Sequence, residues 1–107
     1  MIRDLLKLPK LRSEPYLEWV RSLPCCGCGI TGRNHAHHSV ADRHGSSKHS
    51  DLAAMSLCPA CHACLHAGWP DWEDEYGAQW LHVFRTLDRA VSVGVLVVDA
   101  KVARELA

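Results

Sequence analysis

The stretch CPACHACLH, residues 58–66, decides the fold of this 107-residue chain. Pro59 suits the first turn of a helix, and the pattern predicts that this helix extends over about residues 59–67. His62 and His66 stand four residues apart, so both imidazoles lie on one face of that helix, one turn apart. This spacing suits the capture of one divalent ion, while the cysteines at the helix start point to a neighbouring face. One short helix is therefore expected to serve two metal ions.

Two Cys-x-x-Cys pairs predict a structural zinc site, because two such pairs can place four thiolates tetrahedrally around the ion. The expected ligands are Cys25, Cys28, Cys58 and Cys61. Cys26 is an alternative to Cys25, and Cys64 is expected to be a spare buried thiol or an outer ligand. The 29 residues between the two pairs leave room for a functional element inside the loop that zinc would close.

Two adjacent histidines, His37 and His38, lie in a stretch that predicts a short strand. Neighbouring side chains on a strand point to opposite faces, so one ring can bind the ion held by His62 and His66 while the other reaches a water molecule. Hydrolysis needs this division of labour. The ion stabilises developing charge, and a neutral imidazole with a pKa near neutrality acts as general base. His35 shares a face with His37 and is expected to support the site or to contact a phosphate.

The remaining sequence predicts a basic N-terminal arm, residues 1–13, followed by a single domain, residues 14–107. The expected elements are a helix between Ser13 and Pro24, strands at 35–40 and 52–57, a loop at 41–51, a long helix from Asp71 to Gly94, a strand at 95–98 and a weak helix at 99–106. The prediction of the long helix is based on apolar residues that recur every three or four positions from Trp72 to Val91. Most of this apolar stripe is expected to be buried as core.

Charge is unevenly distributed along the chain, although the formal net charge is zero. Residues 1–48 contain eight Lys or Arg against four acids, and the remainder contains four against eight. The basic half either meets phosphates while the acidic part faces away, or it is a solvated surface with uneven charge. Neither an apolar run long enough for a membrane span nor a signal peptide is visible. We therefore expect a cytoplasmic protein without a membrane partner, in which cysteine pairs bind metal more often than they form disulfides.

Four motifs, PCxxCG, HH, SDL and LCxxCHxxLH in this order, resemble those of HNH nucleases of phage and prophage origin. The tail WEDEYGAQWLHVFRTLDRAVSVGVL is similar to that of the Ref-like, RecA-dependent recombination nucleases. The resemblance covers residues 16–97. It implies an α+β fold with a small zinc-stabilised ββα-metal core and flanking helices, in which a two-stranded hairpin lies over the Cys58–Ala67 helix. It also implies an enzyme that cuts DNA.

The resemblance assigns roles to the residues of the site. His38 would be the general base. The implied ligands of a catalytic Mg²⁺, Mn²⁺ or Zn²⁺ ion are His37, His62 and His66, and those of the structural zinc are Cys25, Cys28, Cys58 and Cys61. The middle Asn of the HNH pattern has no clear match, and Asp51 is a nearer candidate for its role than Asn34. The chain lacks the long basic extension that is expected of some Ref-like members. This difference counts against a RecA-type filament as a partner.

The leading hypothesis is metal-dependent hydrolysis of DNA, with Lys48, Arg43 and Arg33 as candidates for contacts with backbone phosphates. A rival hypothesis is a zinc-dependent nucleic-acid-binding module without catalysis. This hypothesis assigns no function to His37, His38, His62 and His66. A third is a protein–protein adaptor, which requires the aromatic stripe of the long helix to be exposed. Cleavage that depends on a divalent ion separates the first hypothesis from the other two.

Overall fold

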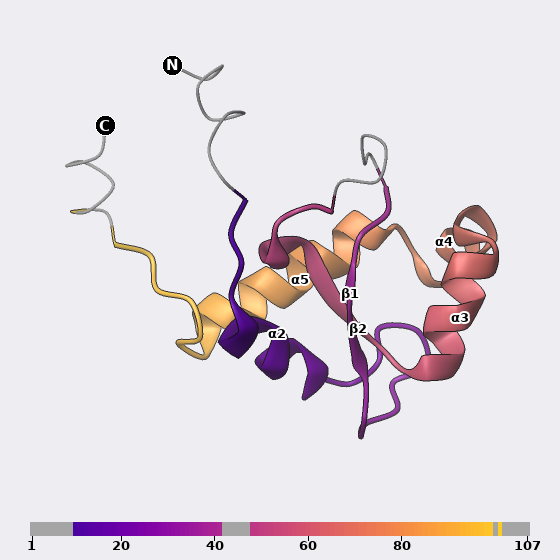
Figure 1. The fold of residues 1–107 in the computed structure, drawn as a ribbon, viewed down its shortest axis with the longest axis horizontal. Helices are drawn as coiled ribbons and strands as arrows, with labels where there is room; N and C mark the ends of the chain where they lie inside the picture. The colour runs from indigo at the N-terminus through magenta and orange to yellow at the C-terminus, as the bar shows by residue number, and fades with distance from the viewer. Residues whose placement is uncertain (1–9, 42–47, 100, 102–107) are drawn as a thin grey trace, which may run out of the picture.

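A computed structural model describes residues 10–41, 48–99 and 101 (Figure 1). Within these residues the chain is a small mixed α/β protein with four α-helices and one two-stranded sheet. The elements are, in order, α2 (Glu14–Arg21), β1 (His35–His38), the short 3-10 helix η1 (Asp51–Ala53), β2 (Ala54–Leu57), α3 (Pro59–Ala67), α4 (Trp69–Tyr76) and α5 (Gln79–Ser92). The expected order of two strands followed by a helix is confirmed, but both strands are shorter than expected: β1 ends at His38, and residues 52–53 belong to η1. None of the described helices is long and apolar enough to cross a lipid bilayer.

The two strands form an antiparallel hairpin, in which His37 lies opposite Met55 and His38 lies opposite Ala54. Residues that lie opposite each other share one face of a sheet. Met55 belongs to a core cluster with residues of α3, α4 and α5, whereas Ala54 packs with residues of α2 and the end of α5. Figure 1 shows the hairpin between α2 on one side and α3 with α4 on the other. His37 and His38 therefore face different helices.

The start of α2 follows the sequence prediction. Ser13 caps this helix, because its side-chain oxygen accepts a hydrogen bond from the backbone N–H of Tyr16. The described part of the N-terminal arm is fixed against the start of η1: the carbonyl of Leu11 accepts a hydrogen bond of 3.0 Å from the backbone N–H of Asp51. Residues 1–9 of the expected arm lie outside the described residues.

The expected long helix from Asp71 to Gly94 is wrong, because the chain breaks between α4 and α5 at Gly77. Gly77 has φ 98° and ψ 164°, a conformation that side chains with a Cβ rarely adopt. The expected burial of the apolar stripe holds only in part. Trp72 and Val83 are buried, whereas Phe84 is 67% exposed and Val91 is 46% exposed, because α5 turns one flank toward solvent.

The segment after α5 is not the expected strand at 95–98 but a turn with irregular backbone. The backbone N–H groups of Val95 and Leu96 both donate to the carbonyl oxygen of Ala90, at 2.8 and 3.1 Å. These donors close the end of α5 and are not available to a neighbouring strand. The helix expected over residues 99–106 lies almost entirely outside the described residues.

Candidate functional site

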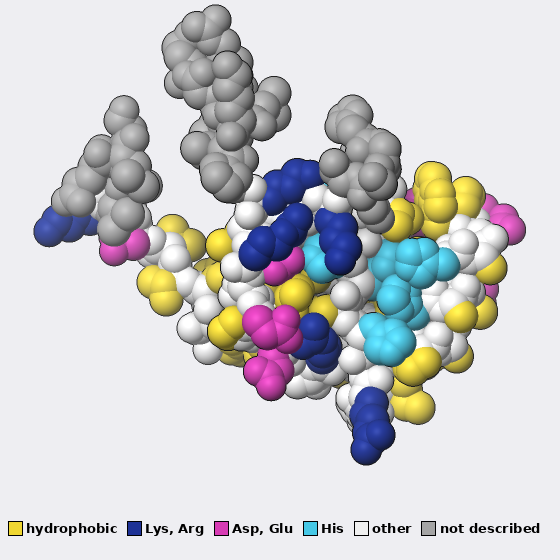
Figure 2. Space-filling view, viewed as in Figure 1, with side chains coloured by type: hydrophobic (Ala, Val, Ile, Leu, Met, Phe, Trp, Pro, Cys, Tyr) yellow, Lys and Arg dark blue, Asp and Glu magenta, His cyan; other side chains and the backbone are white. Residues whose placement is uncertain are grey.

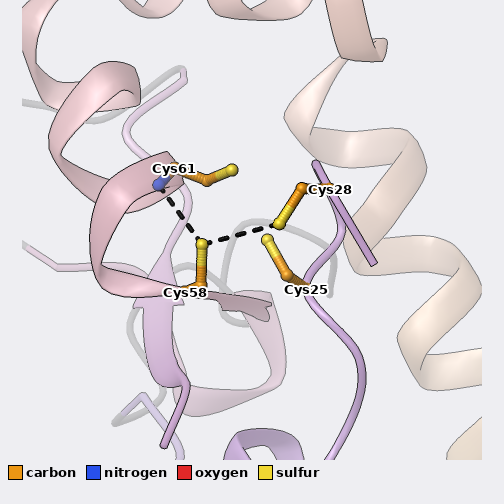
Figure 3. Close-up of side chains that lie close together, drawn as sticks. All are labelled: Cys25, Cys28, Cys58 and Cys61. Carbon is orange, nitrogen blue, oxygen red and sulfur yellow. Dashed lines mark hydrogen bonds between the residues drawn. The ribbon is translucent and has the colours of Figure 1, made fainter. Parts of the chain in front are cut away.

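Four cysteines from two separate segments meet at the start of α3 (Figure 3). The sulfur atoms of Cys25, Cys28, Cys58 and Cys61 all lie within 4.8 Å of one another, and those of Cys28 and Cys58 are 3.7 Å apart. A tetrahedral zinc ion with bonds of about 2.3 Å separates its sulfur ligands by about 3.8 Å. Backbone N–H groups also approach two of the sulfurs: Gly27 lies 3.4 Å from Cys25 Sγ and Cys61 lies 3.4 Å from Cys58 Sγ. The donor set and its spacing fit a structural zinc ion.

The two other cysteines lie outside this tetracysteine cluster. Cys26 is half-buried, and its burial raises the pKa of its thiol to about 11. Burial also opposes ionisation of Cys25, but backbone N–H groups near its sulfur outweigh that effect and lower its pKa to about 7. Cys25 is therefore the better thiolate ligand of the two. Cys64 is exposed, contrary to the expected burial, because Cys61 and Leu65 form the buried face of α3.

Three histidines form a second cluster between β1 and α3. The Nε2 atom of His62 lies 3.1 Å from His37 Nδ1 and 3.1 Å from His66 Nε2. One nitrogen from each ring lies within 4.8 Å of the other two. A tetrahedral ion with nitrogen ligands at about 2.0 Å separates them by about 3.3 Å, so the donor set fits one divalent ion. The structure thus brings together all three residues that the sequence predicted as ligands of this ion.

The outer nitrogens of two of these rings also have partners. His37 Nε2 lies 3.0 Å from the side-chain oxygen of Gln79, and His62 Nδ1 lies 2.8 Å from His35 Nδ1. Such contacts orient metal-binding imidazoles and fix which nitrogen carries the proton. His37 is only 3% exposed, and this burial lowers its pKa to about 4, so the ring is neutral at pH 7. Sequence reasoning gave His35 a supporting role, but it missed Gln79.

His38 lies on the opposite face of β1 and pairs with Asp51. Its Nε2 atom is 2.7 Å from Asp51 Oδ1, and the backbone N–H of Ser13 donates to Asp51 Oδ2 at 2.6 Å. Burial of Asp51 favours its neutral form, but the hydrogen bonds from His38 and Ser13 and the nearby charge of Arg12 lower its pKa overall. The carboxylate therefore stays ionised and accepts a hydrogen bond from the N–H at His38 Nε2. Among the described residues, His38 Nδ1 has no hydrogen-bond partner.

Two adjoining cavities meet at His38. The first has a volume of about 210 Å³ and is lined by Ala36, His37, His38, Lys48, His62 and His66. The second has a volume of about 350 Å³ and is lined by Arg12, Ser13, Glu14, Leu17, His38, Lys48 and Asp51. Figure 2 shows the histidines gathered on this face, with Lys and Arg side chains beside them. The histidine cluster thus opens onto a surface with positive charge.

Of three other residues that the sequence offered for the site, the two that the structure describes do not line the cavities at His38. Asn34 is buried, and its side-chain amide donates to the carbonyl oxygens of Leu23 and Ile30, so it stabilises the segment around the cysteines. Arg33 is exposed and lines neither cavity at His38. Arg43 falls outside the described residues.

The described residues define a small mixed α/β protein with a tetracysteine cluster of the kind that binds zinc. A family profile described as "Protein of unknown function (DUF968)" matches residues 4–94, and the chain belongs to this family. It is similar to "Uncharacterized protein YdfU" of Escherichia coli (strain K12), with 38% identity over 98 residues. That match covers 87% of this chain and 28% of the relative, so the chain spans less than a third of the relative's length. No solved structure matches the chain.

Proposed function

We propose that this protein is a metal-dependent endonuclease of the HNH, or ββα-metal, type that hydrolyses phosphodiester bonds in DNA. One observation carries the proposal: three imidazoles converge beside the pair of His38 and Asp51. The neighbouring residues His37 and His38 of β1 contribute one ring to the imidazole cluster and one to the pair. The hairpin of β1 and β2 followed by α3 is the arrangement that the HNH resemblance implies. The family and its relative carry no functional description, so the proposal rests on the residues of the site.

His38 has the geometry of a general base. Its Nε2–H donates a hydrogen bond to Asp51, so a neutral ring keeps the lone pair on Nδ1 for a proton from water. Asp51 then stabilises the positive charge that His38 gains, and it holds the ring in one orientation. Asp51 therefore takes the orienting role that the middle Asn has in the HNH pattern.

The histidine cluster is the proposed site of a catalytic divalent ion. Its ligands would be His37, His62 and His66, and the ion would supply positive charge that stabilises the phosphate and the leaving oxygen. Imidazole nitrogen suits Zn²⁺, whereas Mg²⁺ prefers oxygen ligands. Among the three expected ions, this ligand set favours Zn²⁺.

The second cavity at His38, which Arg12, Lys48 and Asp51 help to line, is the proposed path of the nucleic-acid backbone. Arg12 and Lys48 line it and can contact phosphate groups without reading the base sequence. Arg12 is held in place, because its guanidinium donates to the carbonyl oxygen of His49 at 2.8 Å. A place in phage or prophage recombination, with a RecA-type filament as partner, follows from the Ref-like resemblance alone.

A cleavage assay tests the proposed function. We expect the purified protein to nick plasmid or single-stranded DNA with Zn²⁺, Mn²⁺ or Mg²⁺, to stop in EDTA, and to recover when the ion is restored. Substitution His38→Ala removes the general base and should slow cleavage by about 10²- to 10⁴-fold, with zinc content and circular dichroism unchanged. His49→Ala is the matched control, because His49 lines neither cavity at His38.

The assay also separates the alternatives. Unchanged cleavage by His38→Ala would contradict the role of this residue. DNA binding without cleavage under every ion would instead favour a zinc-dependent nucleic-acid-binding module without catalysis.

A further inference from the structure

Gln79, the first residue of α5, contacts the histidine cluster from inside the core. Its side chain is fully buried, with an exposed fraction of 0%. Its oxygen Oε1 lies 3.0 Å from His37 Nε2 and 3.1 Å from the backbone nitrogen of Val40. One amide oxygen therefore joins α5 both to a ligand of the cluster and to the chain just after β1.

These two contacts decide which nitrogen of His37 carries the proton. A backbone N–H can only donate, so the atom of Gln79 that meets Val40 is the carbonyl oxygen, which only accepts. The contact with the same oxygen then requires a proton on His37 Nε2. A neutral imidazole has one proton, so His37 Nδ1 keeps its lone pair. That nitrogen is the one that points at His62 within the cluster.

We propose that Gln79 is a positioning residue, which fixes the tautomer and the ring orientation of His37 so that Nδ1 can bind a metal ion. This inference rests on the metal site of the proposed function. The backbone of Gln79 is itself fixed, because its N–H donates to Glu73 Oε2 at 2.8 Å. Among the described residues its side-chain nitrogen is buried without a hydrogen-bond partner. An apolar residue of similar size would avoid that unpaired group, so packing alone does not account for the amide.

A Co²⁺ titration tests this role. In protein whose tetracysteine cluster is loaded with zinc, Co²⁺ in the histidine cluster gives visible absorption without a sulfur charge-transfer band. We expect Gln79→Met, which keeps the volume and loses the acceptor, to weaken Co²⁺ binding by about 10- to 100-fold. Gln79→Glu keeps an acceptor oxygen and should restore binding. Thr86→Val is the matched control. It removes the buried hydrogen bond that the Thr86 hydroxyl donates to the carbonyl oxygen of His82 within α5, away from the histidine cluster, and it should leave Co²⁺ binding unchanged.

The tautomer itself is a second measurement, independent of any variant. The ¹⁵N spectrum of the unaltered protein, with zinc in its tetracysteine cluster and no ion in its histidine cluster, should show His37 protonated at Nε2, and a proton on Nδ1 would overturn the inference. Equal Co²⁺ binding by Gln79→Met and the unaltered protein would also overturn it. Absence of Co²⁺ binding in the unaltered protein would contradict the proposed metal site, and the tautomer of His37 would still decide the role of Gln79.

Discussion

Asp51 is a buried carboxylate with three donors around it. His38 and the backbone N–H of Ser13 each contact one of its oxygens, and Arg12 Nη1 lies 3.3 Å from Oδ1. Hydrogen bonds to a charged group contribute more to stability than neutral ones, and a buried group left without its partner is costly. The same carboxylate therefore stabilises the contact between α2 and η1 and orients His38.

Substitution Asp51→Asn should lower the free energy of unfolding by about 1–3 kcal/mol at pH 7, because an amide meets three donors with only one oxygen. The pKa of Asp51 is lower in the folded protein than its ordinary value of 3.8. The stabilisation is therefore present above that value, and it is lost as the pH falls through the folded pKa. Urea denaturation at several pH values measures the effect, with exposed Asp71→Asn as control. A difference between variant and unaltered protein that does not shrink in acid would contradict this account.

Single residues of the site differ in how far the sequence could predict them. The convergence of His37, His62 and His66 follows from two periodicities, since the strand sets the face of one ring and the helix sets the face of the others. The role of Gln79 could not be predicted in this way. Its position depends on the turn at Gly77, which brings the start of α5 to His37, and one glycine within a helical pattern does not by itself predict such a turn.

At the scale of elements, α3 and its N-cap supply residues to both clusters. Cys58 caps the helix, Cys61 lies in its first turn, and His62 follows directly. The backbone N–H of Cys61 contacts the sulfur of Cys58, so metal binding at the cysteines would also fix the first turn of the helix. The histidine cluster therefore depends on the tetracysteine cluster for the position of its own ligands.

Loss of one cysteine ligand should consequently remove zinc and disturb both clusters. We expect Cys28→Ser to lower the zinc content by at least about one ion per chain and to lower the melting temperature, because structural zinc contributes directly to folding. Cys64→Ser is the matched control, since Cys64 is an exposed cysteine of α3 outside the cluster. Metal analysis and thermal denaturation measure both effects. A zinc content and melting temperature equal to those of the unaltered protein would contradict the role of Cys28 as a ligand.

The helical elements show where sequence patterns are insufficient. Apolar residues keep the same spacing on both sides of Gly77, so their periodicity predicts one long helix and does not reveal the break. The two strands, α2 and α3 were predictable, because each has a local start or stop signal such as Ser13 or Pro59. The exposure of Phe84 could not be predicted, since it depends on how far α5 rotates against the sheet.

At the scale of the whole molecule, the charge pattern agrees with the position of the site. The basic half of the sequence supplies Arg12 and Lys48, which line the cavity beside His38. Half of the eight acids of the second part of the sequence come from α4. The sequence alone left open whether its basic half forms one surface, because that depends on the contact of residues 10–12 with the segment before η1.

DNA affinity, on the proposed function, should fall as salt concentration rises, because phosphate contacts release counterions. We expect Arg12→Gln to weaken binding to DNA of any sequence and to reduce the slope of log affinity against log salt by about one. Arg85→Gln is the matched control, because Arg85 lines a separate cavity with Leu23 and Pro24. Fluorescence anisotropy at several salt concentrations gives both slopes, and equal slopes for the two variants would exclude a phosphate contact by Arg12.

The direct succession of Cys61 and His62 also limits how chains of this fold can diverge in length. A helix rotates by about 100° per residue, so one residue inserted between them would turn both imidazoles of α3 away from His37 while the sulfurs stayed in place. A connection outside regular elements carries no such phase relationship and can lengthen at little cost. Insertions and deletions among related sequences should therefore be absent from Cys58–His66.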